Sequence, residues 1–216
     1  MDFKNKNAIV TGGSRGIGSA IAIALAEKGS NVIFTYAHND DEAGKTLDKI
    51  RSNGVDGYSY KINQENMDEI SKFMEFVKLK FNTVDILINN AGICPFRNYF
   101  DIDKPLFEKV WKINVESHFF ITQEISKIMM HSLAIILGKY GIMVNSLEPG
   151  TILTDINRDD LSDDKKRKYM ESRIPLGRLG KPEDMAGPAL FLVSDENTYV
   201  NGSELLADGG MLVNLQ

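Results

Sequence analysis

Three glycines follow the first apolar run of the chain at the spacing G-x-x-x-G-x-G. Gly12, Gly16 and Gly18 stand between the run 7–11 and a segment whose apolar residues recur at helical spacing from Ile17 onward. Glycines at such a turn let the backbone approach a pyrophosphate closely, while the N-terminus of the following helix supplies amide donors and a positive dipole. Glycines after a strand also serve as plain turn residues, so this pattern alone leaves both interpretations open.

A second group of small and amide residues ends another apolar run. Asn89-Asn90-Ala91-Gly92 closes the strongly apolar run that begins at Val84. At the carboxyl end of a central strand, such residues let a ligand lie against the backbone, as expected at the crevice of an open α/β sheet. Together with the glycine turn, this pattern indicates a dinucleotide site.

The residues that end the second apolar run, 31–36, bear on the choice of dinucleotide. An acid about 20 residues beyond the glycines would bond the ribose 2′-hydroxyl of NAD. The chain has Tyr36-Ala37-His38 there instead. Arg15, with help from His38, would meet a 2′-phosphate, which favours NADP and leaves NAD possible. For His38 itself, an exposed loop position is the preferred interpretation.

The elements that position these residues alternate between strand and helix from Lys6 to Leu147. Strands are expected at 7–11, 31–36, 57–62, 84–89 and 141–147, and helices from Ile17 to Gly29 and at 41–51, 66–80 and 106–130. Continuous apolar strands separated by helices indicate a parallel sheet covered on both faces. We therefore expect an α/β fold with a doubly wound parallel sheet (Rossmann fold), in three α/β/α layers, as a single domain over residues 1–216.

The alternation fails between Met130 and Ser132. There the helix expected from Leu106 meets a second helical pattern, 131–138, with no strand between them. A central strand and its β-α unit, about 30 residues or more, are therefore expected to be missing. Without that strand, its two neighbours would lie about 9 to 10 Å apart with unpaired backbone, where sheet neighbours lie about 4.8 Å apart.

Composition excludes several classes of function. A net charge of −5 gives no electrostatic case for nucleic acid or an anionic membrane surface, and no apolar run approaches the roughly 20 residues of a membrane span. The single cysteine, Cys94, excludes an intramolecular disulfide and suits the cytoplasm; we expect a plain buried thiol. No histidine or cysteine cluster has metal-ligand spacing, so no metal is expected. The basic run 165–168 is interpreted as a solvated helix face.

The motifs together resemble those of the short-chain dehydrogenase/reductase family. Its cofactor signatures stand here as Thr11–Gly18 and Asn89–Gly92, and further matches extend over nearly the whole chain, at 114–115, 144–145, 149–154, 175–184 and 208–210. The resemblance implies an NAD(P)-dependent oxidoreductase that transfers hydride between the nicotinamide and a secondary alcohol or carbonyl. The ending Leu205–Met211 is similar to that of sugar 1-dehydrogenases, while the general pattern also fits 3-oxoacyl carrier-protein reductases.

The resemblance also implies a role for individual residues. Asn63 would meet the adenine, and Asn114 would hold a water of the proton relay through its carbonyl. The segment 153–174 is polar and charged and follows the Pro-Gly turn, so we expect it to form a mobile lid over the substrate. A helix-interior amide that satisfies its own bend is the alternative for Asn114. The family usually forms tetramers, so a homotetramer is expected. The remaining cofactor contacts are Gly12, Ser14, Arg15, Gly16, Ile17 and Gly18 at the phosphates and adenosine ribose, Tyr36 and His38 beside that ribose, Asn90, Ala91 and Gly92 at both riboses, and Pro149, Gly150, Ile152 and Thr154 at the nicotinamide.

The family's polarising serine and its Tyr-x-x-x-Lys pair have no match in the chain. A spacing of four puts tyrosine and lysine on one helical face, where the ammonium lowers the pKa of the tyrosine from its free value near 10. None of the seven tyrosines has a lysine four positions later. The favoured interpretation is an active enzyme whose natural chain carries these residues in a further segment at the Met130–Ser132 junction. A complete chain would instead be a catalytically silent nucleotide-binding protein, and nucleic-acid binding is disfavoured by charge.

Overall fold

The computed structural model describes residues 1–126 and 130–214. Contacts between Cα atoms divide the chain into two compact units. The N-terminal unit is Asp2–Met129, and the C-terminal unit is Met130–Gln216 together with Met1. The single domain expected for the chain stays a prediction.

A parallel sheet of four strands forms the centre of the N-terminal unit. The strands are β1 (Asn7–Val10), β2 (Asn31–Tyr36), β3 (Gly57–Lys61) and β4 (Ile86–Ile88), in the order β3-β2-β1-β4. Ile9 of β1 lies opposite Ile33 of β2 and Leu87 of β4. Both isoleucines are fully buried, as expected for strands covered on both faces. The parallel α/β fold predicted from the apolar runs is confirmed.

Three helices connect these strands and begin within one residue of their expected positions. They are α1 (Gly16–Glu27), α2 (Asp40–Arg51) and α3 (Met67–Lys80). The side chains of Asn39 and Asn66 cap α2 and α3 by accepting from the backbone N–H groups of Glu42 and Asp68. Gly29, with a φ of +92°, stands two residues after α1 in the left-handed conformation that glycine favours.

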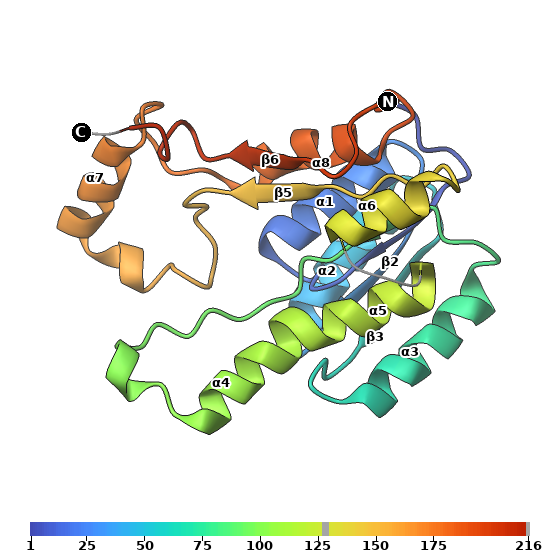
Figure 1. Ribbon diagram of the computed structural model, residues 1–216, viewed down its shortest axis with the longest axis horizontal. Coiled ribbons are helices and arrows are strands. Elements are labelled where there is room, and N and C mark those ends of the chain that lie inside the picture. Colours follow the sequence, from blue (N-terminus) through green and yellow to red (C-terminus); the bar gives the residue numbers. More distant parts are fainter. Residues whose placement is uncertain (127–129, 215–216) are drawn as a thin grey trace. The chain divides into compact units, whose positions relative to one another are not determined.

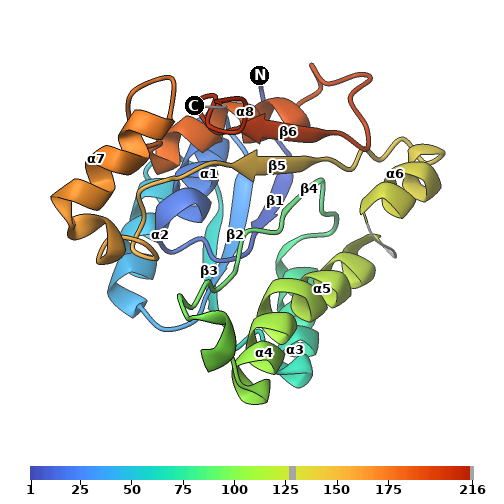
Figure 2. The same ribbon diagram turned by 60° about the vertical axis from the view of Figure 1, so that its left-hand side comes forward.

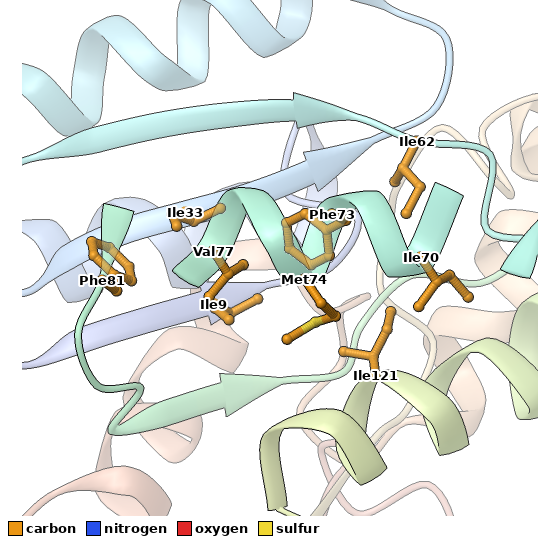
Figure 3. Packing of buried hydrophobic residues seen from close by; sticks show 9 residues of the cluster. All are labelled: Ile9, Ile33, Ile62, Ile70, Phe73, Met74, Val77, Phe81 and Ile121. Carbon is orange, nitrogen blue, oxygen red and sulfur yellow. The ribbon is translucent and has the colours of Figure 1, made fainter. Parts of the chain in front are cut away.

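One hydrophobic core joins the sheet to α3 and to α5, the helix Ser117–Ser126. Figures 1 and 2 show α3 and α5 side by side, and these two helices contact each other. Apolar side chains at i, i+3, i+4 and i+7 turn one face of α3 toward β1 and β2, because that spacing places them on one stripe. Figure 3 shows this cluster, which contains Ile9, Ile33, Ile62, Ile70, Phe73, Met74, Val77, Phe81 and Ile121.

The helix expected at 106–130 is divided by a π-helical turn. After a 3-10 turn at Tyr99–Asp101, α4 (Lys104–Trp111) leads through the π turn Lys112–Glu116 into α5. Asp103 caps α4 by accepting from the N–H of Leu106. The helix was predicted to end at Met130, but that residue begins another helix, α6 (Met130–Gly138); residues 127–129 lie outside the described residues.

The C-terminal unit contains a parallel pair of strands, β5 (Ser146–Pro149) and β6 (Glu204–Ala207), which lie side by side in both ribbon views (Figures 1 and 2). The strand predicted at 141–147 is therefore wrong at its start. Val144 instead donates to the side chain of Asn201 at 2.9 Å and accepts from the N–H of Gly202 at 2.8 Å. A turn thus takes the hydrogen bonds that a strand partner would have taken.

Helical segments fill the rest of the C-terminal unit. They are α6 (Met130–Gly138), a 3-10 turn at Asp160–Ser162, α7 (Asp164–Arg173), a 3-10 turn at Pro182–Met185 and α8 (Ala186–Val193). The basic run 165–168 is exposed on α7, which confirms a solvated helix face. Within the segment predicted as a lid, Leu161 and Ile174 are buried. The mobility of that segment stays a prediction.

Strand pairing differs from the arrangement expected of a complete sheet. Among the described residues, β4 pairs with β1 alone, and β5 pairs with β6 alone. Two of the three residues of β4, Leu87 and Ile88, are only half-buried, whereas the middle residues of β1 and β2 are fully buried. Met130 begins α6 directly beside the expected junction.

Candidate functional site

The glycine turn after β1 has a backbone that other residues adopt only under strain. Gly12 and Gly16 have φ values of +67° and +60°. A Cβ atom at Gly18 would lie 2.3 Å from the carbonyl oxygen of Gly12 and 2.4 Å from Nδ2 of Asn90. Gly12 and Gly16 are thus required by their left-handed backbone, and Gly18 is required because α1 lies so close to the turn.

Hydrogen bonds join the glycine turn to the residues after β4. The hydroxyl oxygen of Thr11 accepts from the backbone N–H groups of Asn90 and Ala91, both at 2.9 Å. In return, Nδ2 of Asn90 donates to the carbonyl oxygens of Thr11 at 2.9 Å and Gly12 at 3.1 Å. The two motifs found in the sequence therefore form one structure, in which the amide of Asn90 holds the glycine turn.

Helix α1 begins without a side-chain cap, as α8 also does. Arg15 stands at its N-cap, with no side-chain cap and no acidic residue in the first turn. In contrast, asparagine or aspartate side chains cap α2, α3, α4 and α7. The first amides and the positive dipole of α1 thus suit an external anion. The groups present fit a pyrophosphate, with Ser14, Arg15, Gly16 and Ile17 at this turn.

A residue outside the sequence motifs, Thr46, supports the same turn. Oγ1 of Thr46, on α2, donates to the carbonyl oxygen of Ser14 at 3.0 Å and lies 2.8 Å from Oγ of Ser19. Thr46 is buried, and so is Thr11. Thr11 is the first residue of the glycine signature found in the sequence, whereas nothing in the local sequence of α2 distinguishes Thr46.

A carboxylate lies near the end of β2, although no acid follows the strand directly. The hydroxyl of Tyr36 donates to Oδ1 of Asp40 at 2.9 Å, and Nζ of Lys61 donates to Oδ1 and Oδ2 at 3.0 and 2.9 Å. The hydrogen bond from Lys61 lowers the pKa of Asp40, while partial burial and the bond to Asp40 raise the pKa of Tyr36. Sequence reasoning missed Asp40 and Lys61. His38 is exposed, as preferred for it.

Asn63 occupies the turn that precedes α3. Its Oδ1 accepts from the N–H of Glu65 at 3.1 Å, and its own N–H donates to Oε2 of Glu69 at 2.7 Å. The side chain is exposed and serves this turn. Its contact with an adenine stays a prediction.

Asn114 lies within the π turn between α4 and α5. Its Oδ1 accepts from the N–H of Ile93 at 2.9 Å, and its Nδ2 donates to the carbonyl oxygen of Ile93 at 2.8 Å. The amide thus ties the loop after Gly92 to the helix and does not satisfy its own bend. Single π turns in helices occur frequently at functional sites. The proposed role of its carbonyl in a proton relay stays a prediction.

His118 stands one helical turn after Asn114 and was not singled out in the sequence. Its ring hydrogen-bonds to the backbone of Ala91, and its Nε2 is buried without a hydrogen-bond partner among the described residues. Burial lowers the pKa of His118, and the bond to Ala91 opposes this effect. The imidazole is therefore neutral at neutral pH.

The four residues expected at the nicotinamide all lie in the C-terminal unit. Gly150 donates its N–H to the carbonyl oxygen of Ala207 at 3.1 Å, and a Cβ there would lie 2.6 Å from Cα of Asp208. Ile152 is buried, Thr154 is half-buried and Pro149 is exposed. These residues form one strand end and turn, while the other expected cofactor contacts lie in the N-terminal unit.

Several remaining expectations concern the chain as a whole. Cys94 is exposed, so the expectation of a buried thiol was wrong; the loop that follows β4 lies on the surface. No helix among the described residues is long and apolar enough to cross a membrane. Within 1–126 and 130–214, no three histidine, cysteine, aspartate or glutamate side chains converge as a metal site would require.

A parallel sheet, a left-handed glycine turn and an uncapped helix N-terminus together define a dinucleotide-binding α/β protein. Family comparison identifies residues 6–137 with the short chain dehydrogenase model and residues 127–212 with the model described as Enoyl-(Acyl carrier protein) reductase. The chain belongs to the short-chain dehydrogenase/reductase family, a class of NAD(P)-dependent oxidoreductases that act on CH–OH groups. This confirms the family and the class of activity expected from the motifs.

Known proteins with similar sequences include sugar dehydrogenases. The chain is 52% identical to L-rhamnose 1-dehydrogenase (NADP(+)) of Thermoplasma acidophilum, with all of both chains covered. It is 32% identical to a 3-oxoacyl-[acyl-carrier-protein] reductase of Staphylococcus epidermidis, with 96% of this chain and 99% of the relative covered.

Solved structures of the family have the same fold. A short-chain dehydrogenase/reductase of Serratia marcescens has a TM-score of 0.90 at 26% identity, with 98% of this chain and 99% of that chain covered. A blue fluorescent protein from a metagenomic library, in complex with NADPH, has a TM-score of 0.89, also at 26% identity and with the same coverage.

This chain is shorter than its relatives in their aligned region. The alignment with the Thermoplasma protein extends over 253 positions, whereas this chain has 216 residues, so at least 37 positions face a gap in this chain. The two family models meet at residues 127–137, the region of the Met130–Ser132 junction. A gap of this length agrees with the loss of one β-α unit.

Proposed function

We propose that the protein is an NADP-dependent sugar 1-dehydrogenase that oxidises the anomeric hydroxyl of a 6-deoxyhexose of the L-rhamnose type. The observation that carries this proposal is the 52% identity with L-rhamnose 1-dehydrogenase (NADP(+)) over the whole of both chains. In this oxidation, C1 loses a hydride, its hydroxyl loses a proton, and the sugar becomes a lactone. When bound, the nicotinamide supplies the hydride acceptor.

The residues of the chain would hold the two halves of NADP separately. The uncapped amides of α1 receive the pyrophosphate, and Arg15 meets the 2′-phosphate. Ala91 and Gly92 line the riboses, while Asn90 keeps the glycine turn in place. The strand end Pro149–Thr154 contacts the nicotinamide. Asp40 does not repel the 2′-phosphate strongly, because Lys61 balances its charge.

Cofactor binding without turnover is a second candidate function. It is favoured by one specific observation: no tyrosine of the chain has a lysine four positions later. In the family, that pair takes up the proton of the substrate hydroxyl. A chain without this pair would keep the glycine turn and would still bind the dinucleotide.

Two measurements on the purified protein separate these functions. Binding is followed by the fluorescence of NADPH and NADH, and turnover by the formation of NADPH from NADP⁺ with L-rhamnose and a panel of other sugars. NADPH binding with turnover of L-rhamnose supports the first proposal, and binding without turnover of any sugar supports the second. A protein that binds neither dinucleotide contradicts both.

We also propose that the protein is a cytoplasmic homotetramer. None of the residues of α4 is buried, and Phe107 and Trp111 on this helix are 61% and 53% exposed, which suits an interface between subunits. The exposed thiol of Cys94 suits a reducing compartment. Light scattering should give about four times the chain mass of 24.1 kDa. A monomer at micromolar concentration would contradict this assembly.

A further inference from the structure

Backbone hydrogen bonds hold the segment Thr151–Thr154 from one side. The N–H of Leu153 donates to the carbonyl oxygen of Gly180 at 2.9 Å, and the N–H of Gly180 donates to that of Thr151 at 3.0 Å. Ile152 thus forms an isolated parallel bridge with Gly180. A Cβ atom at Gly180 would lie 2.3 Å from Cδ1 of Ile152, so a larger residue at this position would force the end of that side chain to move.

The side chain of Asn157 holds the same segment at its other end. Its Nδ2 donates to the carbonyl oxygen of Ile152, and its Oδ1 accepts from the N–H of Thr154, both at 2.9 Å. One amide therefore bridges the two residues between which Leu153 lies. Asn157 and Gly180 together bond to four backbone groups of this segment: the carbonyl oxygens of Thr151 and Ile152 and the N–H groups of Leu153 and Thr154.

An ion pair closes the loop that carries Gly180. The guanidinium of Arg178 donates to both carboxylate oxygens of Asp184, at 2.6 and 3.0 Å, and Nη1 of Arg178 also donates to the carbonyl oxygen of Leu179 at 3.0 Å. Oδ2 of Asp184 accepts from the N–H of Lys181 at 2.7 Å. Leu179 is buried, so the loop is anchored on both sides of Gly180.

The charge of this pair is stable across the physiological range. The hydrogen bonds from Arg178 and from the backbone of Lys181 lower the pKa of Asp184 to about 2. Both side chains are partly exposed, so an isolated pair of this kind would contribute little stability. Its bidentate geometry instead restricts the direction of the loop.

We propose that Asn157 and the Arg178–Asp184 pair are positioning residues that hold Thr151–Thr154 in the conformation that receives the nicotinamide half of NADP. This inference rests on the proposed function, which places Ile152 and Thr154 at the nicotinamide. A segment ordered before binding loses less conformational freedom when the cofactor arrives, and the affinity is higher for that reason. None of the three side chains needs to contact the cofactor.

Two ligands of different size test this role. NADPH uses both halves of the site, whereas 2′,5′-ADP carries only the adenosine half. For Asp184→Asn and for Asn157→Ala, we expect the dissociation constant of NADPH to rise about tenfold and that of 2′,5′-ADP to change less than about twofold. Glu108→Gln, which removes the exposed ion pair of Glu108 with Lys104 on α4, is the matched control and should alter neither constant.

Hydrogen exchange gives a readout that needs no cofactor. In Asp184→Asn and in Arg178→Lys, the amides of Leu153 and Gly180 should exchange faster than in the wild type, because the loop is less restricted. Equal weakening of NADPH and 2′,5′-ADP, or unchanged exchange and unchanged NADPH affinity, would overturn the proposal. If the wild type does not bind NADPH, the proposed function is wrong. The exchange rates would still show whether the Arg178–Asp184 pair orders the segment Thr151–Thr154.

Discussion

At the scale of single residues, Thr11 and Asn90 join the glycine turn after β1 to the residues that follow β4. Thr11 accepts from two backbone N–H groups beyond β4, and Asn90 donates to two carbonyl oxygens beyond β1. All four bonds are part-buried, so the loss of one partner leaves a polar group whose access to water is restricted. The shape of the glycine turn therefore depends on residues that need not contact the ligand.

Replacing Thr11 by valine keeps the volume of the side chain and removes its hydroxyl. Two N–H groups would lose their acceptor, so Thr11→Val should lower the free energy of unfolding by about 1–3 kcal/mol and weaken the binding of 2′,5′-ADP. Urea unfolding and ligand titration measure these effects. Thr11→Ser retains the oxygen and should keep most of the affinity; equal losses in both variants would argue against the hydroxyl as the cause.

His118 makes stability depend on pH in a defined direction. Burial lowers its pKa below the ordinary value of 6.5, so the unfolded chain binds the proton more readily. Its contribution is complete above pH 6.5 and is lost as the pH falls towards the lower pKa of the folded protein. The ring resonance of His118 should titrate below pH 6.5, and His118→Gln should weaken the decline of stability on acidification. Titration of this ring above pH 6.5 would contradict the effect of burial.

At the scale of elements, the sequence predicted the N-terminus of α1 to within one residue. Only the structure showed that no side chain caps it. Its start at Gly16 follows from the glycine turn. The extended backbone of Arg15, with a φ of −159°, already has the conformation of an N-cap residue. A side chain that could cap the helix would therefore compete with an external anion.

Arg15→Asp tests this competition. An aspartate at the N-cap should stabilise the protein by about 0.5–2 kcal/mol, since it accepts from amides that are otherwise uncapped. The same change should weaken the binding of 2′,5′-ADP by more than about tenfold, because it replaces a cation by an anion at the phosphate site. Thermal unfolding and ligand titration provide the two values. Arg15→Gln controls for the loss of the guanidinium, and unchanged affinity in Arg15→Asp would exclude this helix end as the phosphate site.

At the scale of the whole molecule, strand β4 and the junction beside Met130 are the points where a further β-α unit is expected. At least 37 aligned positions face a gap in this chain, and the described residues give β4 no second partner. A catalytic tyrosine and lysine on one helical face would have to come from such a segment.

A chimera tests what this gap removes. The segment of the Thermoplasma relative that has no counterpart here is inserted between Met130 and Ser132, and formation of NADPH from L-rhamnose is measured. The insertion should raise turnover by about a hundredfold or more, the usual contribution of general acid–base catalysis. A tyrosine-to-phenylalanine change in the Tyr-x-x-x-Lys pair that the family resemblance leads us to expect in that segment should abolish that gain. Equal turnover with and without the insertion would show that this chain has its own proton acceptor.

The sequence by itself determined the alternation of strands and helices, the glycine turn, the family and the absence of a tyrosine–lysine pair. These properties depend on residues close together in the chain, where periodicity and turn chemistry act. Only the tertiary structure decided that Thr11 bonds to Asn90, 79 positions away, and that Asn114 holds Ile93. It also decided where the strand after Gly141 begins and how Lys61 engages Asp40. Such contacts join segments that meet only when the helices and strands pack, so no local pattern encodes them.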